Sequence, residues 1–300
     1  MIAVTGEQLQ AWLTAAVVAV FLAADLVIVV LWLMEAGTAR PILAPRWSVA
    51  DLILALQAVV GLLLLSAIPP MLLAMILAPR GQRALEMMPP PIKYGLVILP
   101  IAVLQQVALV TVPLLAAGWK YRLPDEETWE ALGFRAGRGG WRRGLLLGLV
   151  TALVLIPASF ALESGVEYAL NHGWVPAGPA LRQMAREADA GTYVREIGHS
   201  PLAVGLAVLL VGILAPIAEE VFFRGFAYRV LRGRFGVVAG ILLSGVLFGA
   251  AHGNPLALLP ISIMGIVLAV LRERTGSLIP SITVHCLNNC VATVMLLFSR

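Results

Sequence analysis

The sequence has few charged residues for its length. Asp, Glu, Lys and Arg make up 13% of the 300 residues, whereas hydrophobic residues make up 60%. A soluble domain is about a quarter charged and about half apolar. A water-soluble fold of this length could not hide so much apolar surface, because much of any folded surface stays exposed. Together with a mean hydropathy of +0.92, this composition predicts a membrane protein that crosses the bilayer several times.

Cysteines are also scarce, and basic residues are not gathered into a compact domain. The two cysteines, Cys286 and Cys290, lie inside an apolar run, which is typical of small buried residues rather than a disulfide framework. The net charge of +4 reflects arginines in loops, so a nucleic-acid partner is not expected. A cleavable signal peptide is not expected either, because the first ten residues hold no Lys or Arg and the apolar stretch that follows is long enough to span.

Hydrophobic runs long enough to cross a membrane recur along the chain. A span needs about 20 mainly apolar residues to cross roughly 30 Å of hydrocarbon. The predicted fold class is therefore all-α, a polytopic helix bundle of about eight transmembrane helices in the cell membrane, with a buried polar cavity in its C-terminal core. The expected spans are Ala11–Met34, Leu52–Ala78, Tyr94–Ala117, Gly144–Leu162, Leu202–Ala218, Val237–Ala251, Leu256–Leu271 and Leu278–Phe298.

A division near Gly140 separates two regions. Residues 1–140 hold about three accessory spans, and residues 141–300 hold five spans that the short connections bring close together. The basic residues predict the orientation, since connections rich in Lys and Arg stay in the cytoplasm. The richer side, expected to be cytoplasmic with both termini outside, holds Arg40, Arg46, Lys120, Arg122, Arg135, Arg138, Arg142, Arg143, Arg229, Arg232, Arg234, Arg272 and Arg274. The other side holds Arg80, Arg83, Lys93, Arg182, Arg186, Arg195 and Arg300.

Two adjacent glutamates, Glu219 and Glu220, directly continue an apolar run. A carboxylate buried in apolar surroundings is costly unless it is paired or protonated. Glu220 and Arg224 are four residues apart and share a helix face, so they can pair. Glu219 is rotated by about 100° from Glu220, which leaves it free to act as a general base in a low-dielectric site. The alternative is a helix end with an ordinary ion pair.

Two histidines also fall in or beside the last spans. His252 follows Phe248 and the small residue Gly249 at the end of the sixth span, where small residues let another helix come close. His285 and Asn289 are four residues apart in the last span and together present two hydrogen-bond donors suited to an oxyanion hole. The alternatives are a structural histidine for His252 and an interhelical hydrogen bond for the pair on the last span.

The positions of the two histidines impose a geometric condition. His252 ends its helix, whereas His285 lies about 10 Å inside the last span at a rise of roughly 1.5 Å per residue. The two meet only if the short sixth span stops in the middle of the membrane or tilts. A cavity is predicted at that place.

The three motifs, taken in order, resemble those of the CAAX-protease and bacteriocin-processing family of glutamic intramembrane proteases. The resemblance covers roughly residues 202–298. The motifs are Glu219-Glu220-x-x-x-Arg224, Phe248-x-x-x-His252 and His285-x-x-x-Asn289.

The resemblance implies an all-helical membrane fold and an intramembrane endopeptidase that hydrolyses a peptide bond without a metal or another cofactor. Glu219 and His252 would activate the attacking water, and His285 with Asn289 would stabilise the oxyanion. The implied partner is a peptide or protein substrate, lipidated or membrane-embedded, within the lipid bilayer. The residues implied to support the site are Glu220, Arg224 and Phe248.

Three alternatives stay open from the sequence. A zinc-dependent membrane protease would use Glu219, His252 and His285 as ligands, although no His-Glu-x-x-His motif is present. A non-proteolytic peptide-binding or bacteriocin-immunity-type protein would use the same pocket without catalysis. A transporter would favour inverted repeats, which the sequence does not show.

Overall fold

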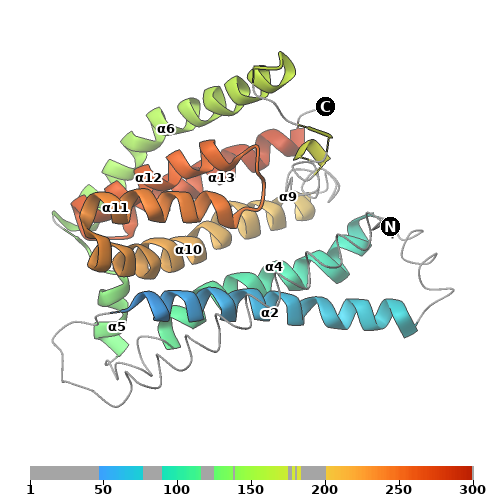
Figure 1. Ribbon diagram of the computed structural model, residues 1–300, viewed down its shortest axis with the longest axis horizontal. Coiled ribbons are helices and arrows are strands. Elements are labelled where there is room, and N and C mark those ends of the chain that lie inside the picture. The colour runs from blue at the N-terminus through green and yellow to red at the C-terminus, as the bar shows by residue number, and fades with distance from the viewer. Residues whose placement is uncertain are drawn as a thin grey trace, which may run out of the picture.

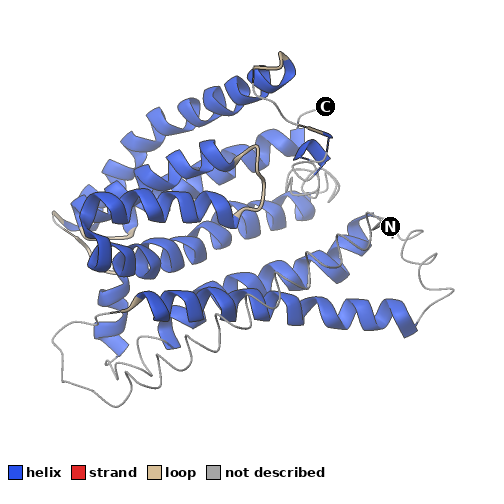
Figure 2. Ribbon diagram, in the orientation of Figure 1, coloured by secondary structure: helices blue, strands red, loops and turns tan. Residues whose placement is uncertain are grey.

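The computed structural model describes residues 47–76, 90–115, 125–137, 139–174, 178–179, 181–183 and 201–298. Over these residues the elements are helices (Figure 2), which confirms the all-α class. The predicted span Ala11–Met34 lies outside the described residues. The helices are α2 (Val49–Ile76), α4 (Pro90–Leu115), α5 (Asp125–Leu132), α6 (Gly140–Asn171), α9 (Pro201–Ala207), η2 (Val208–Leu214), α10 (Ala215–Glu220), η3 (Val221–Ala227), α11 (Tyr228–Ala251), α12 (Leu258–Thr275) and α13 (Ile279–Phe298).

Three helical stretches of the described residues are long and apolar enough to cross a membrane: Gly140–Asn171, Val204–Ala251 and Ile279–Phe298. Shorter apolar helical stretches occur at Val49–Leu62 and Ala102–Leu115. The chain is therefore a membrane protein. The count of eight spans, the cavity and the division near Gly140 stay predictions.

The helices after residue 200 lie roughly side by side, with α6 on one side of them and the α2–α4 pair on the other (Figure 1). Glycines bring neighbouring helices into close contact. A Cβ on Gly148 of α6 would lie 2.6 Å from Cβ of Thr283 on α13, and a Cβ on Gly265 of α12 would lie 3.0 Å from Cα of Gly245 on α11. Such small-residue contacts are how membrane helices approach closely without a hydrophobic driving force.

The stretch Val204–Ala251 is bent back on itself at Gly236. This residue has φ +83° and ψ 175°, a backbone conformation that glycine adopts without steric cost. The two arms of the turn touch, because a Cβ on Gly240 would lie 2.7 Å from Cα of Arg232. The predicted fifth and sixth spans thus form a tight helical hairpin.

The first arm of this hairpin contains two π-helical segments, η2 and η3, on either side of α10. Pro216 explains the first, since proline removes an N–H and its ring clashes with the carbonyl four residues earlier. Side chains of α13 satisfy the carbonyls near this break. Asn289 donates to the carbonyl of Val211 at 3.3 Å, and the Cys290 thiol lies 3.5 Å from the carbonyl of Gly212. Irregular backbone at membrane depth is tolerated where neighbouring helices satisfy it in this way.

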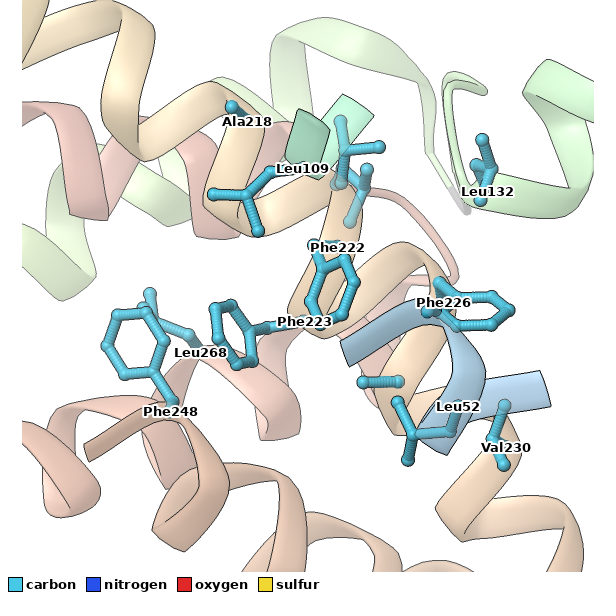
Figure 3. Packing of buried hydrophobic residues seen from close by; sticks show 14 of the residues in the cluster. Leu52, Leu109, Leu132, Ala218, Phe222, Phe223, Phe226, Val230, Phe248 and Leu268 are labelled. Atoms are coloured by element: carbon cyan, nitrogen blue, oxygen red, sulfur yellow. The ribbon is translucent and has the colours of Figure 1, made fainter. Parts of the chain in front are cut away.

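A hydrophobic core holds this irregular segment in place (Figure 3). Phe222 and Phe226 of η3 are fully buried. Leu52 of α2 and Leu109 of α4 belong to the same cluster, so the helices before residue 140 share a core with those after it. Trp47 extends the cluster through an edge contact with Phe226, with ring centroids 4.9 Å apart.

Connections predicted to lie on one side of the membrane meet in the structure. The loop after α5 and the loop before α13 bond to each other: Leu278 N–H donates to the carbonyl of Gly133 at 3.0 Å, and Arg135 Nε donates to the carbonyl of Gly276 at 2.9 Å. The orientation relative to the cytoplasm stays a prediction.

Candidate active site

A buried ion pair stands at the centre of the site. Glu220 and Arg224 are both fully buried, and Arg224 Nη1 lies 2.8 Å from Glu220 Oε1. Arg224 Nη2 also donates to the carbonyl of Gly265 on α12 at 3.2 Å, and its guanidinium lies 4.1 Å from the ring centre of Phe248. The pairing predicted from the four-residue spacing is therefore present, and it ties α10 and η3 to the helices around them.

Glu220 has a second partner that the sequence did not reveal. His285 Nδ1 lies 3.1 Å from the same oxygen, Oε1, and His285 is 1% exposed. Because Glu220 pairs with Arg224, its carboxylate is ionised, and an ionised carboxylate accepts hydrogen bonds but cannot donate them. His285 therefore donates its Nδ1–H to Glu220. Glu220 thus fixes the orientation of the imidazole and turns its Nε2 toward Glu219.

Glu219 lies between the two histidines. Its Oε2 is 3.9 Å from Nε2 of His252 and 3.7 Å from Nε2 of His285. This oxygen is buried and has no hydrogen-bond partner within the described part of the chain. Side chains from three separate helical segments thus meet here, two imidazoles on either side of one unsatisfied carboxylate oxygen.

His252 has a defined tautomer and partial access to solvent. Its Nδ1 lies 2.8 Å from the carbonyl of Phe248. A carbonyl only accepts, so Nδ1 carries the hydrogen, and Nε2 of the neutral ring is an acceptor. The His252 side chain is 33% exposed, against 13% for Glu219, so the site is more open on the His252 side.

The length of the second arm of the hairpin brings His252 to Glu219. From residue 237 to residue 251 this arm rises only about 22 Å, and the connection to α12 lies short of the far ends of α9 and α13 (Figure 1). The helix expected over Val237–Ala251 is therefore present and short, and its crossing of the membrane stays a prediction. The Nε2 atoms of both histidines lie within 4 Å of the same oxygen of Glu219.

Phe248 forms an apolar wall beside these groups. It is fully buried, and its ring centre lies 4.7 Å from that of His252 and 5.4 Å from that of His285, both in edge contacts. Its carbonyl binds His252 and its face covers Arg224. Phe248 therefore positions both a histidine and the buried arginine.

Asn289 makes an interhelical hydrogen bond, which is one of the two roles predicted for it. Besides its bond to the Val211 carbonyl, its Oδ1 lies 3.4 Å from the amide nitrogen of Asn288. These two hydrogen bonds do not run to Glu219, His252 or His285, so its part in an oxyanion hole stays a prediction. One of its two amide hydrogens is left for such a role.

No group of three or more His, Cys, Asp or Glu is arranged to hold a metal ion within the described ranges. Zinc ligands at about 2.0–2.2 Å from a common tetrahedral centre would lie roughly 3.3 Å apart. The corresponding distances from Glu219 are 3.9 Å and 3.7 Å. Metal analysis of the purified protein is the direct test of the zinc alternative.

The fold and the site define a class: a helical membrane protein with a buried glutamate–histidine cluster. Residues 201–291, which contain this cluster, match the family described as Type II CAAX prenyl endopeptidase Rce1-like. The match confirms the resemblance predicted from the three motifs.

Two relatives are similar to the chain in sequence. The "Putative membrane peptidase YdiL" of Bacillus subtilis (strain 168) is 26% identical over 225 residues, which are 68% of this chain and 88% of that protein. The "Uncharacterized 24.3 kDa protein" of Escherichia coli is 36% identical over 85 residues, 27% of this chain and 39% of that protein. No solved structure matches the chain. At the level of the family, these similarities indicate a membrane endopeptidase.

Proposed function

We propose that the chain is a multi-pass intramembrane endopeptidase of the cell membrane in which Glu219 and His252 activate a water molecule. One observation carries the proposal: Glu219 Oε2 is buried without a partner and lies 3.9 Å and 3.7 Å from the Nε2 atoms of His252 and His285. Buried, unsatisfied carboxylate oxygens are costly. One that faces two imidazoles is suited to binding and polarising water.

The distances fit one bridging water. They exceed a direct hydrogen bond, which needs about 2.7–3.2 Å, but a water about 2.8 Å from each group spans such a gap. His252 Nε2 accepts, because Nδ1–H is bound to the Phe248 carbonyl. The water would therefore donate one hydrogen to Glu219 and the other to His252, which leaves a lone pair directed at a substrate carbonyl.

The reaction follows from this arrangement. The water oxygen bonds to the carbonyl carbon while its proton passes to Glu219. The tetrahedral intermediate then breaks its C–N bond, and Glu219 returns the proton to the departing amine. The products are a new carboxylic acid, which keeps the second hydrogen of the water until it ionises to solvent, and a new amine, and Glu219 ends unprotonated as it began.

His285 is proposed to stabilise the oxyanion as an imidazolium. Two carboxylates and Arg224 carry a net charge of −1, and an imidazolium at His285 makes the buried cluster neutral, which apolar surroundings favour. With Nδ1–H bound to Glu220, the second hydrogen on Nε2 faces the reacting group. Preorganised donors of this kind are commonly the largest contribution to acyl-transfer catalysis. Asn289 is proposed as the second donor.

The proposed substrate is a membrane-anchored peptide. The family description names a CAAX prenyl endopeptidase, and the C-terminal C-a-a-X motif is a cysteine that receives a prenyl group followed by three residues. The prenyl chain would lie in the lipid beside the bundle, and the peptide would reach Glu219 from the open side near His252.

The test is a cleavage assay with the purified protein reconstituted in lipid vesicles. Peptides ending in a farnesylated cysteine and three further residues are compared with the same peptides lacking the farnesyl group, and products are mapped by mass spectrometry. The proposal expects release of a C-terminal fragment from the farnesylated peptides. If neither set is cleaved while both bind, the chain is a peptide-binding protein instead.

A further inference from the structure

Several arginines gather at one end of the helix bundle. The connections around α5, α11, α12 and α13 meet there. The acidic residue Glu273 already has other partners. Arg232 donates to both of its oxygens at 2.8 and 3.0 Å, and the hydroxyl of Tyr228 donates at 2.8 Å. Arg135, Arg229 and Arg272, here called the arginine cluster, have no carboxylate partner among the described residues.

Arg272 is the member that most needs a partner. It is 7% exposed, and its buried Nε has no hydrogen-bond partner within the described ranges. Its guanidinium lies directly against Gly133, where a Cβ would come within 2.7 Å of both Cζ and Nη2. Gly133 has φ +102°, so glycine suits both the backbone conformation and the space that the guanidinium occupies. The charge of Glu273 acts on Arg272, but no hydrogen bond joins the two within the described ranges, and a buried guanidinium without a directly bonded acceptor is unfavourable.

The other two members are held close to Arg272 by backbone carbonyls. Arg135 donates to Gly276, and Arg229 donates to Ala131. These bonds fix the guanidinium groups in place, but a carbonyl does not neutralise their charge. Arg229 binds the carbonyl two residues before Gly133, against which the Arg272 guanidinium packs, and Arg135 follows Gly133 by two residues. Three like charges around one short loop make a site that an anion stabilises.

The cluster lies at the end of the apolar part of α12. Arg272 directly follows Leu271, and α13 begins again with apolar residues at Ile279. We expect such a boundary between apolar and charged residues to lie at the level of the lipid headgroups. Arg135 is exposed, Arg229 is partly buried and Arg272 is buried, so burial increases from Arg135, here called the mouth of the cluster, to Arg272, here called its floor.

We propose that the arginine cluster binds a phosphate-bearing anion, with Arg272 at the floor of the site and Arg135 at its mouth. The planar guanidinium offers paired N–H donors that match phosphate oxygens. An acidic phospholipid headgroup and free inorganic phosphate share this chemistry. The site is separate from the glutamate–histidine cluster and does not depend on the proposed peptidase activity.

The experiment measures binding to the purified full chain. Native mass spectrometry counts adducts of dioleoyl phosphatidylglycerol and, separately, of dioleoyl phosphatidylcholine. A thermal-unfolding series in detergent adds inorganic phosphate at constant ionic strength. Phosphatidylglycerol adducts without a response to free phosphate identify a lipid headgroup. A rise in the unfolding temperature with phosphate, without lipid preference, identifies free phosphate. Either result supports the anion site.

Variants connect the binding to the cluster. Arg272→Gln should weaken binding of the anion about tenfold or more, as expected for the loss of charge-assisted hydrogen bonds. Arg274→Gln removes an equal charge from an exposed position two residues further along α12 and should leave binding unchanged. If Arg272→Gln does not fold, Arg135→Gln, at the exposed mouth of the cluster, replaces it in the comparison with Arg274→Gln. The proposal is overturned if neither probe binds, or if Arg274→Gln weakens binding as much as Arg272→Gln or Arg135→Gln.

Discussion

Substituting Glu220 by Gln should destabilise the protein more than any change at an exposed ion pair. Glu220 and Arg224 are both fully buried, and the oxygen that Arg224 binds at 2.8 Å also accepts from His285 at 3.1 Å. The substitution keeps the shape but removes the charge. Arg224 would then donate only to neutral acceptors, the amide oxygen of the new side chain and the carbonyl of Gly265. Breaking a buried pair in this way costs about 3–5 kcal/mol of unfolding free energy.

The chain provides a matched control in Glu273. This glutamate also pairs with an arginine at 2.8 Å, but the side chains of Arg232 and Glu273 are 48% and 25% exposed. Exposed pairs contribute about 0–1 kcal/mol, so Glu273→Gln should have a small effect. The double variant Glu220→Gln/Arg224→Met removes both charges and should recover a large part of the lost stability, because the arginine charge is removed together with its partner.

The assay is reversible unfolding in mixed micelles titrated with dodecyl sulfate, followed by near-ultraviolet circular dichroism. The reasoning requires Glu220→Gln to lose at least about 2 kcal/mol more than Glu273→Gln. Equal losses would show that the Glu220–Arg224 pair is not the structural centre of the site. A double variant less stable than Glu220→Gln would show that Arg224 stabilises the fold through its other contacts.

Three further predictions concern packing, catalysis and metal. Gly212→Ala places a Cβ 2.7 Å from Sγ of Cys290 and should cost about 1–3 kcal/mol of stability by overpacking. In the control Gly205→Ala, the new Cβ meets nothing within 4 Å, so this variant should be neutral or stabilising. Equal unfolding midpoints of the two variants would contradict this. His252→Asn should lower kcat about 10²–10⁴-fold. The control His172→Asn, outside the site, should leave kcat unchanged. An unchanged kcat in His252→Asn would show that His252 takes no part in the reaction. Chelators should leave cleavage unaffected, and stoichiometric zinc with chelator-sensitive cleavage would replace the metal-free mechanism.

Local features of the site could be predicted from the sequence. The four-residue spacing of Glu220 and Arg224 determines that they share a helix face, and the structure contains the pair. The short sixth span and the small residue Gly249 indicated a close approach by another helix. A Cβ on Gly249 would lie 2.8 Å from the carbonyl of Leu258. These predictions succeeded because they depend on residues near one another in the chain.

The rest depends on how helices meet, and sequence spacing does not encode it. The bond between Glu220 and His285 joins residues 65 positions apart, so Glu220 was expected only to pair with Arg224. The π-helical segments on both sides of α10 change which residues face α13. Pro216 was the one visible signal for the first of them. For Asn289 the sequence left open an oxyanion donor or an interhelical hydrogen bond; the structure contains an interhelical bond, to a carbonyl near that break, and the oxyanion role stays a prediction.

The most direct measurement compares Glu219→Gln with wild type for both cleavage and binding of the same farnesylated peptide. Glutamine keeps the size of the side chain but cannot take a proton from water. Glu163→Gln, an exposed glutamate of α6, is the matched control. The account predicts that Glu219→Gln loses cleavage by about 10²-fold or more while peptide binding and the control remain near wild type. Cleavage retained by Glu219→Gln would contradict the central claim that this carboxylate activates the attacking water.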